Sequence, residues 1–210
     1  MQEFSALLGI VAALTVGVVS PGPSFVMVAR TAVSSSRTEG AAAALGMGVG
    51  AVVFAVAALL GLQGILLAVP SLYLALKIAG GLYLAYLGLR IWASARQPLM
   101  VTGLSSGTST TKLKSVALGF TTQISNPKTA IVYASVFAAF MPAARSYSFD
   151  FALIALVFAI EAGWYAVVAV ALSSQRPRGA YLRYKSWVDR MAGGVMIALG
   201  LKLASSAHRV

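Results

Sequence analysis

The stretch "VVSPGPSFVMVAR", residues 18–30, places two prolines and a glycine inside an otherwise apolar run. Pro21 and Pro23 cannot donate backbone hydrogen bonds, and each one restricts the residue before it. The surrounding run, residues 4–29, contains no charged residue and is long enough to span a membrane. The sequence therefore predicts a membrane helix, residues 4–24, that is interrupted at residues 21–23.

The composition of the chain indicates that its solvent is the lipid bilayer. Its 210 residues are 59% hydrophobic and 10% charged, and the mean hydropathy is +0.86. A soluble domain averages about 25% charged residues, so this chain has too little charge to cover a globular surface. The excess of Lys and Arg, 16 against 5 Asp and Glu, is explained by basic cytoplasmic loops and does not indicate a nucleic-acid partner.

The reactive side chains are few. The chain has no cysteine, which excludes disulfides, thiolate metal sites and cysteine nucleophiles. Its one histidine, His208, lies two residues from the C-terminus, where a histidine metal site or a Ser–His triad is not expected. We therefore expect no metal and no cofactor, and a membrane enzyme is a weak alternative.

Apolar runs separated by loops predict an all-α polytopic membrane protein with six spans. The expected spans are residues 4–24, 41–62, 70–92, 115–140, 149–173 and 187–206. The loops after the first, third and fifth spans hold ten Lys and Arg residues against three on the other side, so the positive-inside rule places these loops in the cytoplasm and both termini outside.

A second interrupted span, "TTQISNPKTAIVYAS" at residues 121–135, matches the first. Aligning Pro23 with Pro127 pairs Gly22 with Asn126. The segments "AGGLYLAYLGLR", residues 79–90, and "AGGVMIALGLK", residues 192–202, also resemble each other. The chain therefore reads as two three-helix repeats, residues 1–100 and 115–210, joined by a flexible cytoplasmic loop, residues 101–114. An odd number of spans inverts the second repeat, and inverted repeats with broken helices are typical of transporters.

The helix breaks define the candidate substrate site, because the free N-terminal end of a half-helix suits a carboxylate. Glu161, the one acidic residue deep inside an expected span, binds either the substrate ammonium or a coupling proton, or it is a structural partner of Lys128. Lys128 itself neutralises Glu161, holds the substrate carboxylate, or reaches the membrane interface. Asn126 either contacts the substrate or caps the unwound backbone. The candidate substrate-binding residues are Pro21, Gly22, Pro23, Ser24, Gln123, Asn126, Pro127, Lys128 and Glu161.

Nearly the whole chain resembles the LysE/RhtB family of amino-acid exporters, including its homoserine/threonine-type efflux proteins. The resemblance rests on the PGP segment, on "GLYLAYLGLR" and on the NPK segment, in this order and spacing. It implies six membrane helices and efflux of amino acids, neutral ones or close derivatives, coupled to a proton or cation gradient across a bacterial cytoplasmic membrane. The family commonly has an acidic residue where this chain has Ala51, so the role of that acid does not carry over.

Two further questions stay open at the level of sequence. A channel or a lipid-handling protein built on the same inverted repeat is the alternative function. Gly46 and Gly50 form a GxxxG face that suits either an internal helix contact or a homodimer. Trp164 and Tyr165, which neighbour Glu161, are candidates for lining the transport path.

Overall fold

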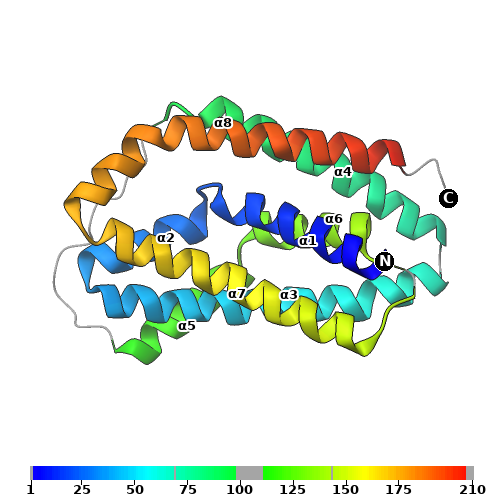
Figure 1. Cartoon of the computed structure of the whole chain (residues 1–210), viewed down its shortest axis with the longest axis horizontal. Helices are drawn as coiled ribbons and strands as arrows, with labels where there is room; N and C mark the ends of the chain where they lie inside the picture. Colours follow the sequence, from blue (N-terminus) through cyan, green and yellow to red (C-terminus); the bar gives the residue numbers. More distant parts are fainter. Residues whose placement is uncertain (1, 69, 98–110, 143, 207–210) are drawn as a thin grey trace.

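The computed structural model describes residues 2–68, 70–97, 111–142 and 144–206, and every regular element in these ranges is an α-helix. The helices are α1 (Gln2–Val19), α2 (Pro23–Ser34), α3 (Arg37–Ala68), α4 (Pro70–Ser94), α5 (Lys112–Ile124), α6 (Pro127–Phe140), α7 (Tyr147–Leu172) and α8 (Gln175–Ser206). Across the break between α1 and α2, and again between α5 and α6, the chain continues in the same direction (Figure 1). The helix hairpins elsewhere reverse its direction, and α1 begins at the end of the molecule where α8 ends.

Both predicted helix breaks are present, and they share the same local design. Pro23 is the first residue of α2 and Pro127 is the first residue of α6, a position where the missing N–H of proline costs nothing. Gly22 and Asn126, which the alignment paired, are the two N-cap residues, and both have extended backbones. The two paired residues therefore occupy the same helix position, although only Asn126 caps its helix with a side-chain hydrogen bond, and the two three-helix repeats stay a prediction.

The predicted end of the first span, residue 24, is wrong. After the break α2 continues to Ser34, because Phe25, Val28, Ala29 and Ala32 recur at helical spacing and bury their side chains in one core cluster with residues of α3 and α7. The single charge of α2, Arg30, does not end the helix.

Part of the predicted loop 101–114 is also helical. Thr111 caps α5 by accepting a hydrogen bond from the backbone N–H of Lys114, at 3.4 Å, so that residues 112–114 belong to the helix. Residues 101–110 of that loop lie outside the described residues. The helices α3 and α8 likewise begin before the expected spans, at Arg37 and Gln175.

The two AGG motifs pack against each other between α4 and α8. A Cβ on Gly88 would lie 2.6 Å from the carbonyl oxygen of Gly193, and a Cβ on Gly200 would overlap the carbonyl oxygen of Gly81. The last glycine of each motif thus rests on the first glycines of the other, a reciprocal contact that only residues without a side chain permit.

The GxxxG face of α3 is an internal contact. A Cβ on Gly46 would overlap the carbonyl oxygen of Val116 in α5, and one on Gly50 would lie 2.8 Å from the Cβ of Gln123. Of the two alternatives for this face, the structure places the internal helix contact there.

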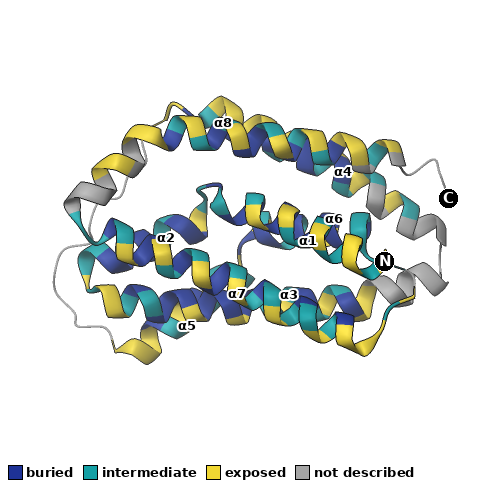
Figure 2. Cartoon of the chain, viewed as in Figure 1, coloured by how far each residue is buried: buried dark blue, intermediate teal, exposed yellow. Residues whose placement is uncertain are grey.

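Three helices of the described part are long and apolar enough to cross a membrane, over Gln2–Val19, Arg37–Gly61 and Tyr147–Leu172. The expected fourth span does not qualify as one helix because the break divides it, and its second half, Pro127–Phe140, is apolar but short. Figure 2 shows the buried residues on the inward faces of the helices and the exposed residues on the outward faces. Large apolar residues such as Leu60 and Phe151 are exposed there, as expected of a lipid-facing surface. The count of six spans stays a prediction.

Candidate functional site

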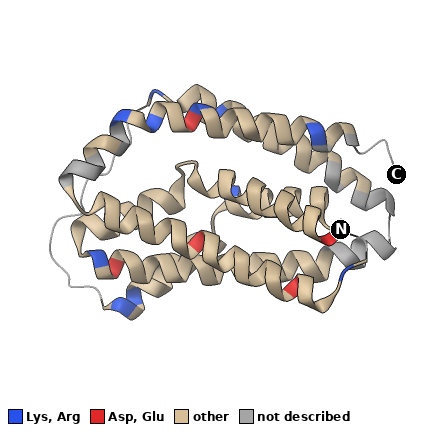
Figure 3. Cartoon of the chain, viewed as in Figure 1, with Lys and Arg blue, Asp and Glu red and all other residues tan. Residues whose placement is uncertain are grey.

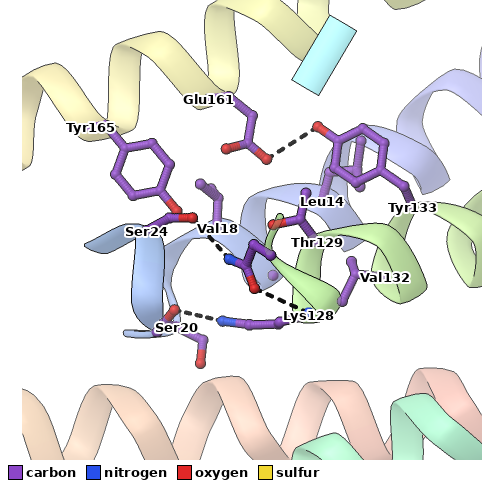
Figure 4. Close-up of a pocket in the computed structure, with 13 residues that line it drawn as sticks. Leu14, Val18, Ser20, Ser24, Lys128, Thr129, Val132, Tyr133, Glu161 and Tyr165 are labelled. Carbon is purple, nitrogen blue, oxygen red and sulfur yellow. Dashed lines mark hydrogen bonds between the residues drawn. The ribbon is translucent and has the colours of Figure 1, made fainter. Parts of the chain in front are cut away.

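The two helix breaks lie in the middle of the molecule (Figure 1) and line a small polar cavity (Figure 4). The first break contributes Ser20, Gly22 and Ser24, and the start of α6 contributes residues up to Tyr133. The volume of the cavity is about 20 Å³, which is enough for a water molecule. Its polar side chains are Ser20, Ser24, Asn126, Lys128, Thr129, Tyr133, Glu161 and Tyr165, and its apolar wall includes Leu14, Val18 and Val132.

A chain of side-chain hydrogen bonds joins the two breaks. The Asn126 amide donates to the Ser24 hydroxyl at 2.8 Å, and this hydroxyl donates to Gln123 Oε1 at 2.9 Å. The side-chain carbonyl oxygen of Asn126, Oδ1, in turn accepts from the backbone N–H of Lys128, at 3.1 Å. Asn126 therefore caps α6 and lines the cavity at once, so the two roles expected for it are compatible.

This series of hydrogen bonds ends at Glu161 of α7, whose carboxylate accepts hydrogen bonds from neutral donors. Gln123 Nε2 donates to Glu161 Oε2 at 3.0 Å, and the Tyr133 hydroxyl donates to Glu161 Oε1 at 3.1 Å. The side chain is only 4% exposed, and Gln123 is fully buried. A buried carboxylate is expensive unless its oxygens are hydrogen-bonded, and these two donors supply that need.

Lys128 is held by the other break and not by Glu161. Its ammonium donates to the backbone carbonyl of Ser20 at 2.7 Å. This carbonyl lies at the C-terminal end of α1, where the carbonyls have no partner within the helix and where the helix dipole favours a cation. The cavity therefore contains one basic and one acidic side chain, each bound to neutral groups.

The predicted site residues divide into three groups. Gly22, Ser24, Asn126, Lys128 and Glu161 line the cavity. Gln123 lies behind the cavity wall and connects Ser24 to Glu161. The three prolines, Pro21, Pro23 and Pro127, do not line the cavity, and they shape the breaks that bring the other residues together.

Sequence reasoning missed Tyr133 as part of the cavity, whereas Tyr165 was a candidate for lining the transport path and does line the cavity. Tyr133 follows Thr129 by four residues and Tyr165 follows Glu161 by four residues, so each pair shares one helix face. Both tyrosines line the cavity, and the hydroxyl of Tyr165 points toward Ser24 (Figure 4). The spacing of four residues between two polar side chains in an otherwise apolar helix is the sequence pattern that could have predicted both tyrosines as cavity residues. Trp164, the other candidate beside Glu161, is not part of the cavity lining.

A second buried acid was also missed. Asp189 of α8 is 2% exposed and forms an ion pair with Lys185 at 2.6 Å. It lies near the start of the expected sixth span, where a charge is ordinarily a helix-end residue, so Glu161 is not the one acid buried among the helices.

The regular elements in the described part of this mostly apolar chain are all helices, and a polar cavity lies at two helix breaks, an arrangement typical of membrane transport proteins. The comparison with known families agrees, because residues 15–207 match the LysE type translocator family. The chain therefore belongs to the LysE type translocators, which are transporters and not enzymes.

Relatives of known name support the same assignment. The chain is 32% identical over 192 residues to the threonine efflux protein of Escherichia coli K12, covering 91% of this chain and 93% of that protein. The threonine efflux protein of Salmonella typhi is similar to the same degree, and an uncharacterized membrane protein of Haemophilus influenzae is 26% identical over 189 residues, covering 89% of this chain and 90% of that protein. No solved structure gives a significant match.

Proposed function

We propose that this protein exports neutral amino acids across a bacterial cytoplasmic membrane, as a secondary transporter with its substrate site at the two helix breaks. The observation that carries this proposal is the separation of charge in the cavity. Lys128 and Glu161 line the same cavity, yet each is bound to neutral groups. An amino acid carries the complementary pair of charges, an ammonium for Glu161 and a carboxylate for Lys128.

The hydrogen-bond partners of the two charges suit an exchange with such a substrate. The ammonium would take the place of Gln123 as a donor to Glu161 while Tyr133 keeps its hydrogen bond, and charge-assisted hydrogen bonds are the stronger ones. The substrate carboxylate would take the place of the Ser20 carbonyl as the acceptor for Lys128. The N-terminal end of α6, at Asn126 and Lys128, adds a positive dipole end on the same side.

The charges also indicate the substrate class. The charged residues that line the cavity are Lys128 and Glu161, and together they match a zwitterion without a third charge. A neutral side chain is therefore the expected cargo. The named relatives are threonine efflux proteins, so threonine is the first candidate to be measured.

The small cavity supports alternating access as the mechanism. A volume of about 20 Å³ holds roughly one water, so an amino acid needs the walls to separate before it can bind. The breaks at residues 20–22 and 125–126 interrupt the helices at the level of the cavity, and such discontinuities allow the halves to tilt. Export against a gradient then needs a coupling ion, for which we propose a proton carried by Glu161.

The distribution of basic residues supports the predicted orientation of the protein in the membrane. Figure 3 shows most Lys and Arg at the end of the molecule opposite the start of α1 and the end of α8. By the positive-inside rule this end faces the cytoplasm, and both termini face outside.

The proposal is tested with proteoliposomes loaded with a mixture of amino acids, each followed by mass spectrometry, with and without an imposed pH gradient. We expect saturable loss of threonine or a few other neutral amino acids, accelerated by the gradient. Vesicles that contain folded protein and lose no amino acid selectively would contradict the proposal. Non-saturable loss of many solutes would indicate a channel instead.

A further inference from the structure

Ser20, at the first helix break, carries a buried hydroxyl that the hydrogen bonds between the breaks do not use. The residue is 2% exposed and lines the cavity, and among the described residues its Oγ has no hydrogen-bond partner. The bonds that join the two breaks run through Ser24 and Asn126 instead. A buried hydroxyl without a partner is costly, so its place in the cavity wall suits a ligand that supplies the partner.

The Ser20 hydroxyl lies beside the Lys128 ammonium. This ammonium donates to the backbone carbonyl of Ser20 at 2.7 Å, which brings it next to the side chain of the same residue. Figure 4 shows Ser20 and the end of the Lys128 side chain together, on the side of the cavity away from Glu161. A cation attracts an anion and repels the ammonium of a substrate, so the ligand group expected beside this hydroxyl is an anionic acceptor.

Gly22 leaves room for an anion next to the ammonium. A Cβ at this position would lie 3.3 Å from Cδ and 3.5 Å from Nζ of Lys128, so the open side of the glycine faces the lysine side chain. Gly22 is also the N-cap of α2 and makes no side-chain capping bond, whereas Asn126 makes one at the start of α6. The N-terminal end of α2, with its positive dipole end, is therefore not covered by the side chain of its N-cap residue.

We propose that Ser20, Gly22 and Lys128 form the carboxylate subsite of the transporter, in which Ser20 Oγ donates to one carboxylate oxygen and Lys128 Nζ to the other. This inference rests on the proposed function, to which it adds a substrate-binding residue and a selectivity. Hydrogen bonds to a charged acceptor are stronger than those to a neutral one, so two such donors distinguish a carboxylate from a neutral amide of the same shape. The protein should therefore favour amino acids over their amides.

Two variants separate the hydrogen bond of Ser20 from the space at Gly22. Ser20→Ala removes the donor and should raise KM for threonine export by about tenfold, the effect of one hydrogen bond to a charged group. The unfolding temperature should not fall, because the hydroxyl has no partner to lose. Gly22→Ala adds a methyl group beside the ammonium, in an extended backbone (φ −156°, ψ −167°) that alanine also adopts. This methyl group should weaken carboxylate and amide ligands alike.

The measurement is the concentration dependence of L-threonine export from proteoliposomes, with L-threoninamide loaded at increasing concentrations as the competitor. We expect the wild type to bind the amide more weakly than threonine. In Ser20→Ala, KM for threonine should rise while the inhibition constant of the amide stays the same, and in Gly22→Ala both should rise. Ser115→Ala is the matched control, because Ser115 is also 2% exposed with an unpartnered Oγ but does not line the cavity. It should behave as the wild type.

Loss of the preference for threonine over its amide in Ser20→Ala alone supports the inference. Equal rises for both ligands in Ser20→Ala, an unchanged KM in Ser20→Ala or in Gly22→Ala, or a wild type that binds the amide as tightly as threonine would overturn it. Each of these results leaves amino-acid export itself in place. Absence of selective export by the wild type overturns the proposed function and this inference with it.

Discussion

The ammonium of Lys128 and the backbone carbonyl of Ser20 are joined by a hydrogen bond of 2.7 Å, which ties the second helix break to the first. A broken membrane helix leaves carbonyls that cannot stay unpaired away from water, and Lys128 supplies the missing donor. The same ammonium lies beside the cavity that Glu161 lines from the other side. The Lys128 ammonium thereby satisfies the carbonyl at the break of the first helix, and it is also a group that can bind a carboxylate.

Replacement of Lys128 is expected to affect both stability and export. Lys128→Met leaves the Ser20 carbonyl without its donor and should lower the free energy of unfolding by about 1–3 kcal/mol. It also removes the proposed partner of the substrate carboxylate, so export should fall to the background of empty vesicles. Lys128→Arg, which keeps the charge, should retain more stability than Lys128→Met. Thermal unfolding in detergent and vesicle export measure the two effects. Export by Lys128→Met at the wild-type rate would contradict the role of this residue in binding.

Ser24 is the centre of the hydrogen-bond chain between the breaks. Ser24→Ala removes the acceptor of Asn126 and the donor to Gln123, so two buried amide groups each lose a partner. We expect a loss of about 1–3 kcal/mol in the free energy of unfolding. Thr121→Ala is the control, because the exposed Thr121 hydroxyl bonds only to backbone carbonyls of its own helix. Equal unfolding temperatures for the two variants would show that these side-chain hydrogen bonds do not stabilise the two helix breaks.

Tyr133 is expected to matter for the site because it holds one oxygen of Glu161. Tyr133→Phe keeps the ring, which packs beside Phe137, and removes the hydrogen bond of 3.1 Å. Without this donor, Glu161 is less well fixed, and KM for export should rise by about tenfold, the effect of one hydrogen bond to a charged group. Tyr147→Phe, at an exposed tyrosine, should leave KM unchanged. An unchanged KM in Tyr133→Phe would remove Tyr133 from the site.

The reciprocal glycine contact between α4 and α8 gives a test of the fold that does not depend on transport. A Cβ at Gly200 would overlap the Gly81 carbonyl, so Gly200→Ala must push the two helices apart. Overpacking of this kind costs about 1–3 kcal/mol. Gly163→Ala is the control, since no atom lies within 4 Å of a Cβ at that position and alanine favours a helix. The unfolding temperature should fall in Gly200→Ala and stay equal or rise in Gly163→Ala.

The sequence was most informative where the backbone itself is constrained. Pro21, Pro23 and Pro127 can occupy few positions in a helix, so the breaks and the pairing of Gly22 with Asn126 could be predicted. Glu161 was predictable as a candidate site residue because a carboxylate among apolar residues is costly, and the structure places it in the cavity lining. The prediction failed at the end of the first span, because the helix resumes after the break and packs its apolar face against α3 and α7.

The partners of these residues could not be predicted from one sequence. Whether Lys128 reaches Glu161 or Ser20 depends on how the two breaks cross, which is a relation between residues 108 positions apart. Tyr133 reads as an ordinary apolar helix residue until α7 is placed beside it. Asp189 resembles a helix-end charge until the packing of α8 against α4 buries it.

The central claim is that Glu161 receives the substrate ammonium and the coupling proton inside the cavity between the breaks. The most direct test is threonine export by Glu161→Gln in proteoliposomes, with and without a pH gradient, beside Asp150→Asn as a control for the loss of a carboxylate elsewhere on α7. The glutamine keeps the size of the side chain and an acceptor for Tyr133. We predict that Glu161→Gln loses export and its acceleration by the gradient, while Asp150→Asn keeps both. Wild-type export by Glu161→Gln with an unchanged response to the gradient would contradict the claim.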